Sequence, residues 1–258
     1  MKKLFSMLTL LCLFALQLSG QYNVKAMNMG TDVPGKNFIK TNLTSMLLKN
    51  FSLQYERALT KTISASVSYR FMPTTNVIFK DQISDYIDSE DENIQDIIDN
   101  ANISNYAITP ELRFYMGKKG YGRGFYIGTY YRYANFDFDN IHAEFETDEQ
   151  ATVNIVAAGN IKSHSAGILL GAQWALSRHL CLDWWIQGMH FGKASGIAEA
   201  LPSPALTTEE QDAIRDELAN LEIPETDITY EVSSNRVGMT LKGPWAGIRA
   251  GISLGIRF

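Results

Sequence analysis

Strict alternation of apolar and polar residues is the feature that most constrains what this chain can fold into. Residues 63–71 show it most clearly, with Ile63, Ala65, Val67, Tyr69 and Phe71 alternating with Ser64, Ser66, Ser68 and Arg70. A period of two residues places successive side chains on opposite faces of a β-strand. The segment therefore predicts a strand with one apolar face and one polar face.

The same alternation recurs along the chain, in segments at residues 39–47, 51–56, 63–71, 108–114, 125–133, 165–174, 180–187 and 248–258. In the sixth segment Leu169 is the exception, and in the seventh the polar parity includes Asp183, Trp185 and Gln187. Eight amphipathic segments, none of them helical in period, predict an all-β fold. We expect a transmembrane antiparallel up-and-down β-barrel of about eight strands.

The charges within these segments fall on the inward, polar parity. They are Lys40, Glu56, Arg70, Glu111, Arg113, Arg132, Asp183, Arg249 and Arg257, and only Arg57, at a strand end, falls on the other side. A basic side chain facing lipid at the bilayer midplane costs about 2–4 kcal/mol, so a membrane barrel must turn its charges inward. An eight-stranded barrel is just wide enough for its own side chains, so these residues predict a hydrogen-bonded ionic network that plugs the interior.

The connections between the segments alternate in length. The long ones cover roughly residues 73–104, 138–162 and 193–235, as expected where long extracellular loops alternate with short periplasmic turns. Of the 28 acidic residues, 24 lie in these connections or at their edges, which predicts acidic extracellular loops. Thr207 to Gln211, followed by Ala213, Ile214 and Leu218, is typical of a capped helix start, so short helices are expected in the loops.

The first residues indicate export. Residues 1–20 combine Lys2 and Lys3 with a short apolar run, as in a cleaved signal peptide, so we expect residues 21–35 to be a periplasmic segment and 36–258 the barrel domain. Cleavage removes Cys12 and leaves Cys181 without a disulfide partner. Cleavage also lowers the formal net charge from −5 to −7, which argues against nucleic acid as a partner.

Other motifs offer weak evidence for chemistry. Gly251 to Gly255 matches the G-x-S-x-G pattern of a nucleophile elbow, which requires a strand, a sharp turn and a helix. His164 with Ser163 and Ser165 suggests a lipid-modifying hydrolase as an alternative function. The histidines show no metal-ligand spacing, and we expect no metal, no cofactor and no catalytic residue.

The chain resembles the small OmpA/OmpX-type outer-membrane barrels, and more closely an uncharacterised family of short barrels from Gram-negative gut and oral bacteria. The resemblance rests on Lys36–Leu43, on Phe51–Leu59 and on the ending Gly255-Ile256-Arg257-Phe258. It implies location in the cell outer membrane and no known reaction. It also implies contact with outer-membrane lipids and lipopolysaccharide, and with the barrel-assembly machinery, for which Phe258 would be the signal.

The first functional hypothesis is a non-enzymatic barrel with a structural, adhesive or partner-docking role, its partner being a surface protein bound by the acidic loops. The alternatives are the hydrolase and a narrow channel running past Arg70, Arg113 and Arg132. Aromatic residues on the lipid-facing parity are expected to form interfacial girdles, and they include Tyr55, Phe71, Phe114, Tyr131, Tyr133, Trp174 and Trp184.

Overall fold

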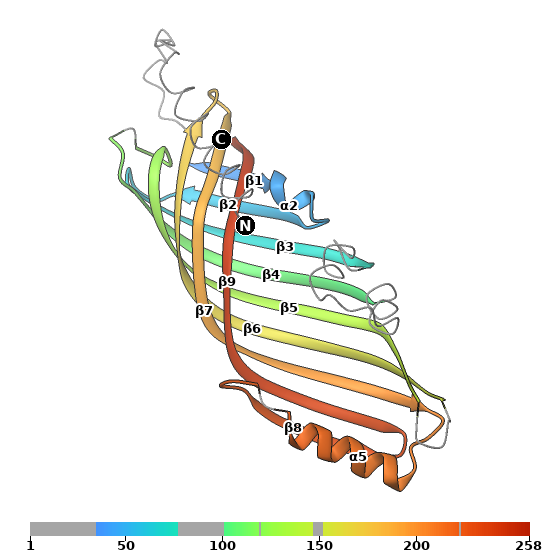
Figure 1. Cartoon of the computed structure of the whole chain (residues 1–258). Helices are drawn as coiled ribbons and strands as arrows, with labels where there is room; N and C mark the ends of the chain where they lie inside the picture. The colour runs from blue at the N-terminus through green and yellow to red at the C-terminus, as the bar shows by residue number, and fades with distance from the viewer. Residues whose placement is uncertain (1–34, 77–100, 119, 147–151, 222) are drawn as a thin grey trace, which may run out of the picture. The chain divides into compact units, whose positions relative to one another are not determined.

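A computed structural model describes most of the chain, in residues 35–76, 101–118, 120–146, 152–221 and 223–258 (Figure 1). The expected signal peptide, nearly all of the expected periplasmic segment and most of the first acidic connection lie outside these residues. The described residues belong to one compact unit, Gly35–Phe258.

Long antiparallel strands make up this unit. In chain order the elements are β1 (Asn37–Asn42), α2 (Leu43–Met46), β2 (Phe51–Ala58), β3 (Ile63–Asn76), β4 (Asn102–Tyr115), β5 (Gly124–Glu146), β6 (Thr152–Ala175), β7 (Leu180–Ser203), α5 (Thr208–Ala219), β8 (Asp227–Ser233) and β9 (Arg236–Arg257).

The sheet closes into a ring. Each of β1 to β6 pairs with the next strand, β7 pairs with β9, and β9 pairs back onto β1, from Phe38 opposite Arg257 to Asn42 opposite Ser253 (Figure 1). All of these pairs are antiparallel, and β8 pairs with β9 outside the ring. The prediction of an antiparallel up-and-down barrel of about eight strands is therefore confirmed.

The expected loop at residues 138–162 is largely strand and the one at 193–235 is partly strand, so the bounds predicted for these two loops are wrong. Strand β5 continues to Glu146 and β6 begins at Thr152, while β7 continues to Ser203 and β9 begins at Arg236. Backbone pairing needs no alternation of side chains, because the ladder bonds join main-chain groups. Strands can therefore continue where the amphipathic pattern fades.

The first segment is also shorter than expected, because β1 ends at Asn42. The Asn42 side chain caps the short helix α2 by accepting a 2.9 Å hydrogen bond from the backbone N–H of Ser45. The capped helix expected after Thr207 is confirmed as α5. Its capping box pairs the Thr207 hydroxyl with the N–H of Glu210, at 3.3 Å, and the Glu210 carboxylate with the N–H of Thr207, at 2.7 Å.

A β-bulge in β7 changes which residues face inward. The register with β9 shifts between Trp185 and Gly188, which adds one residue to β7 and reverses the parity beyond that point. Gln187, expected to face inward, is therefore exposed, and His190 is buried, with 8% of its surface accessible. The sequence carries no signal for the bulge apart from Gly188.

The outer surface carries a belt of exposed apolar residues, including Leu53, Val67, Leu112, Ile168 and Ile252. Rings in contact across β2 to β6 lie along one edge of this belt, in the order Phe51, Phe71, Tyr69, Tyr106, Tyr133 and His164. At the other edge, Trp174 and Trp184 stack with their centroids 6.4 Å apart. We call this surface the apolar belt.

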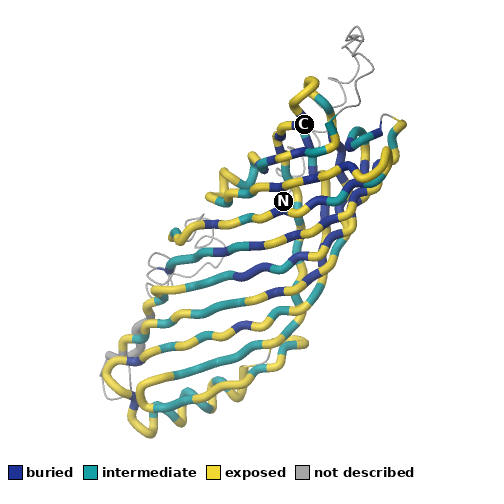
Figure 2. Tube along the Cα trace, turned by 180° about the vertical axis from the view of Figure 1, so that it is seen from behind, coloured by how far each residue is buried: buried dark blue, intermediate teal, exposed yellow. Residues whose placement is uncertain are grey.

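Burial changes along the barrel. Buried positions concentrate toward the end that carries the C-terminus, whereas the far parts of the long strands are mostly intermediate or exposed (Figure 2). On the outward face of β7 the belt ends at Phe191, and Lys193 and Glu199 follow it as exposed residues. We call the parts of β5 to β9 beyond the belt, with α5, the strand extension.

Candidate functional site: the barrel interior

A cluster of ion pairs fills the interior of the barrel inside the apolar belt. The Lys40 ammonium contacts the Glu56 carboxylate and lies 2.6 Å from Asp183. The Arg113 guanidinium lies 2.6 Å from Asp183, 2.6 Å from Glu111 and 3.1 Å from Glu56. All five side chains have no accessible surface. We call these five residues the ionic plug.

Neutral side chains add hydrogen bonds to the ionic plug. The Tyr115 hydroxyl donates to Glu56, at 2.8 Å, and the Tyr126 hydroxyl donates to Asp183, also at 2.8 Å. The Gln173 carbonyl accepts from Lys40, at 2.7 Å. Burying a charged group is costly unless it is hydrogen-bonded, so the two tyrosines stabilise the carboxylates and Gln173 stabilises the ammonium.

An aromatic layer packs against the ionic plug. It consists of Tyr115, Tyr126, Tyr130, Leu169 and Trp185. Leu169 is fully buried in it, which explains why an apolar residue appears there at the inward parity. A Cβ at Gly171 would lie 2.4 Å from the Tyr126 ring, so only glycine leaves room for that tyrosine.

Of the other four predicted network residues, only Arg249 reaches the ionic plug. The Arg70 guanidinium donates to the Asn105 side chain, at 3.0 Å, and Arg132 donates to the Thr109 hydroxyl, at 3.2 Å. Arg249 lies over the rings of Tyr130 and Trp185, with its Nη1 3.8 Å from Glu111.

At the opposite end of the barrel interior, Arg257 donates to the backbone carbonyls of Gly35 and Tyr121, at 2.6 and 3.2 Å. The nine predicted charges therefore form three groups, namely the ionic plug, an arginine group beyond the aromatic layer, and Arg257.

Residues that the sequence reasoning missed are mostly neutral. Tyr115, Tyr126 and Gln173 face inward and bond the ionic plug, but a neutral residue at the inward parity gives no signal that it touches a charge. His190 was missed because its inward orientation depends on the bulge in β7.

The residues considered for catalysis do not come together. His164 is exposed on the outer face, where its Nδ1 lies 2.5 Å from the Tyr131 hydroxyl, whereas Ser163 and Ser165 are buried on the inner face. Ser253 faces inward within the continuous strand β9, without the turn and helix of a nucleophile elbow. Within the described ranges, no three His, Cys, Asp or Glu side chains are grouped so that they could hold a metal ion.

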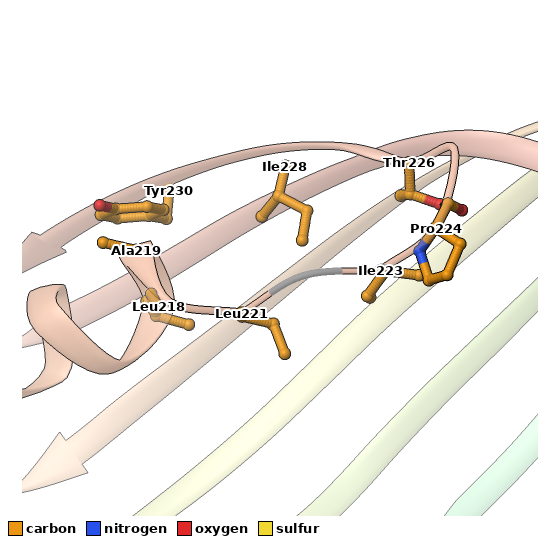
Figure 3. A pocket seen from close by; sticks show the side chains of 8 residues that line it. All are labelled: Leu218, Ala219, Leu221, Ile223, Pro224, Thr226, Ile228 and Tyr230. Atoms are coloured by element: carbon orange, nitrogen blue, oxygen red, sulfur yellow. The ribbon is translucent and has the colours of Figure 1, made fainter.

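A separate hollow of about 600 Å³ lies between α5 and β8, in the strand extension. Figure 3 shows its lining, which is mostly aliphatic, with hydroxyl groups only on Thr226 and Tyr230. None of its lining residues that the structure describes carries a carboxyl, thiol or imidazole group that could support catalysis. Among the described residues, no helix is both long and apolar enough to cross a membrane.

The family model described as "Protein of unknown function (DUF3575)" matches residues 6–189, which include all five residues of the ionic plug. The chain belongs to this family. The expectation of a family without a known reaction is thus confirmed, while the likeness to OmpA/OmpX-type barrels and the bacterial source remain predictions. The DUF3575 match ends in β7 and does not reach Arg249, Arg257 or Phe258. No curated protein sequence matches the chain.

Three solved structures share a low similarity with this DUF3575 chain. CarO of Acinetobacter baumannii is 8% identical, with a TM-score of 0.35, over 89% of this chain and all of that chain. CarO2 of the same organism is 10% identical, with a TM-score of 0.31, over 83% of this chain and 99% of that chain. The translocator domain of the autotransporter NalP from Neisseria meningitidis is 9% identical, with a TM-score of 0.27, over 96% of this chain and 97% of that chain.

Proposed function

We propose that this DUF3575 protein is a non-enzymatic outer-membrane barrel, closed by its ionic plug, that presents the strand extension as a docking surface for a protein partner outside the cell. The observation that carries the proposal is the inverted distribution of polarity, in which ion pairs are fully buried inside and large apolar side chains are exposed outside. In water such a surface would be unfavourable, and exposed apolar areas of this size mark contact with a membrane or a partner.

The dimensions of the apolar belt support a membrane. Along β3 it runs from Ile63 to Phe71, and nine residues at roughly 3.3 Å each, tilted by about 40°, span roughly 23 Å. An outer-membrane barrel shows lipid an apolar band of about 25 Å between two aromatic girdles. The ring row from Phe51 to His164 and the Trp174–Trp184 pair lie where those girdles are expected.

The strand extension supports docking. Beyond Phe191, β7 continues for about twelve residues, which corresponds to roughly 40 Å of strand. Its outward face carries charged residues such as Lys193 and Glu199, and its edge carries the helix α5. The same face also exposes Ile197 and Leu201, and a surface of mixed polarity held above a membrane needs no catalytic group to dock a protein.

Gel mobility in mild detergent, compared before and after boiling, tests the barrel and its location. We expect the protein extracted from outer membranes to migrate faster unboiled, because a closed barrel resists unfolding by the detergent. Equal mobility, together with release of the protein as soluble periplasmic material, would contradict the membrane proposal.

Planar-bilayer recording tests the closed interior. We expect no conductance steps above background for the intact protein, because fully buried side chains of the ionic plug occupy the interior and the aromatic layer packs against them. Regular single-channel steps would favour the narrow channel instead.

Binding of a surface protein is then sought by cross-linking from residues of α5, with cross-linking from the periplasmic turn at Ser177 as the control.

Tryptophan quenching by brominated lipid locates the apolar belt. Trp174 is 38% exposed on the outer face, whereas Trp185 is 7% exposed in the aromatic layer. In variants that keep only one of the four tryptophans, we expect strong quenching of Trp174 and little quenching of Trp185. Equal quenching of both would contradict the assignment of the outer face to lipid.

A further inference from the structure

The barrel wall has a seam beside β9. On one edge β9 pairs with β7 along most of its length, and on the other it pairs with β8 through residues 236–242 and with β1 through residues 253–257. Between these two partners, residues 243–252 pair with no described strand on that edge. The connection containing α2 covers the end of this stretch nearest β1, where the Thr44 hydroxyl accepts a 3.3 Å hydrogen bond from the N–H of Ile252.

A cavity of about 290 Å³ opens at this seam. The guanidinium groups of Arg70, Arg132 and Arg249 line its inner side, together with hydroxyl and amide side chains of β1, β2, β3 and the α2 connection. Leu48 and Ile248 line it as well and are exposed. The cavity therefore joins the interior of the barrel to the level of the apolar belt.

The positive charge in this cavity is not balanced by the described part of the protein. Arg70 and Arg132 form hydrogen bonds to neutral side chains and no ion pair with a described residue. Arg249 has only the distant Glu111, at 3.8 Å. The Nε of Arg70 and the Nη1 of Arg249 are buried without a hydrogen-bond partner among the described residues. The three guanidinium groups repel one another, which an anion between them would relieve.

The arginines are also held in place. Asn105 fixes the Arg70 side chain, Thr109 fixes Arg132, and Arg249 is stacked at 4.5 Å over the Tyr130 ring. Fixed guanidinium groups present donors in pairs that match the oxygens of a phosphate, and less conformational freedom is lost on binding. The volume lies just below the range of roughly 300–1,000 Å³ that is typical of small-molecule pockets, so it suits a headgroup or a small solute.

We propose that Arg70, Arg132 and Arg249 form a binding site for a phosphate group, either as a free ion in the barrel interior or on a lipid headgroup that enters at the seam. The site is not part of the proposed docking surface and depends only on a folded barrel. Gel mobility of each variant before and after boiling therefore separates a lost barrel from a lost site.

Isothermal titration calorimetry of the full-length barrel in neutral detergent tests the proposal. One titration uses inorganic phosphate and the other short-chain phosphatidic acid, both at constant ionic strength so that screening does not change. We expect saturable binding of at least one probe, and Arg132→Gln and Arg70→Gln each to weaken it by about tenfold or more. Arg132→Lys, which keeps the charge but not the fork of donors, should fall between.

Arg257→Gln is the matched control, because Arg257 also points into the barrel but bonds only backbone carbonyls at the other end. The affinity of the Arg257→Gln variant for either phosphate probe should equal that of the unaltered protein. Binding of inorganic phosphate supports a soluble ligand, and binding of phosphatidic acid alone supports a lipid headgroup. No saturable binding of either probe, or an equal loss in Arg257→Gln, overturns the proposal.

Discussion

Replacing Arg113 with alanine is expected to destabilise the barrel by about 3–5 kcal/mol, the cost of removing one partner from a buried ion pair. The guanidinium contacts three carboxylates, those of Glu56, Glu111 and Asp183. Without it, Lys40 would remain beside Glu56 and Asp183, and Glu111 would keep only Arg249, at 3.8 Å. Unfolding by guanidinium chloride in lipid vesicles, followed by tryptophan emission, measures the loss.

Arg215→Ala is the control for this experiment. Arg215 pairs with Asp212 on the exposed face of α5, so its removal should cost less than about 1 kcal/mol. An Arg113→Ala protein that is destabilised no more than this control would show that the ionic plug does not stabilise the barrel. The expected size of the effect reflects the unpaired carboxylates left behind and not the net contribution of the ion pairs, which in buried sites is small.

The second large effect is expected from a charge on the lipid-facing surface. Val67 lies at the middle of the apolar belt on β3 and is 46% exposed, so Val67→Arg should cost about 2–4 kcal/mol if that surface faces hydrocarbon. The loss of unfolding free energy is measured in vesicles as before. In detergent micelles, which are less ordered than a bilayer, we expect the loss to be smaller.

Leu201→Arg is a matched substitution outside the belt. Leu201 is 56% exposed near the end of β7, in the strand extension, and should tolerate arginine to within about 0.5 kcal/mol because that surface faces water. Equal costs at the two positions would mean that Val67 does not face lipid, and the membrane proposal would be wrong.

The alternation of side chains predicts the ring of strands because it is imposed by two different surroundings, an apolar one outside and a polar one inside. Val67, on the apolar parity, is 46% exposed on the outer surface, whereas its neighbour Ser66 is buried on the inner face. Beyond the belt, side chains on both faces of the strands are mostly intermediate or exposed, so that constraint is weaker. The continuation of β5 to Glu146 and of β7 to Ser203 could not be predicted from alternation for this reason.

Which charges pair is a matter of register, which the sequence does not reveal. Asp183 and Glu56 are 127 positions apart, yet Lys40 reaches both, while Arg70 lies beyond their reach higher on its strand. Alternation gives all four residues the same inward parity and assigns no height along the barrel. The bulge in β7 adds a further change, because one extra residue turns Gln187 outward and His190 inward.

The closure of the ring has a consequence for how the protein is made. Asn37 and Phe258 exchange backbone hydrogen bonds of 2.9 and 3.0 Å across a separation of 221 positions, and β1 meets β9 over only five residue pairs. A chain that lacks residues 253–257 cannot make this closure. A chain truncated before residue 236 would lack β9 altogether, which would leave one edge of β1 and one edge of β7 unpaired. Such edges readily pair with other chains, so shorter products of synthesis are prone to aggregate.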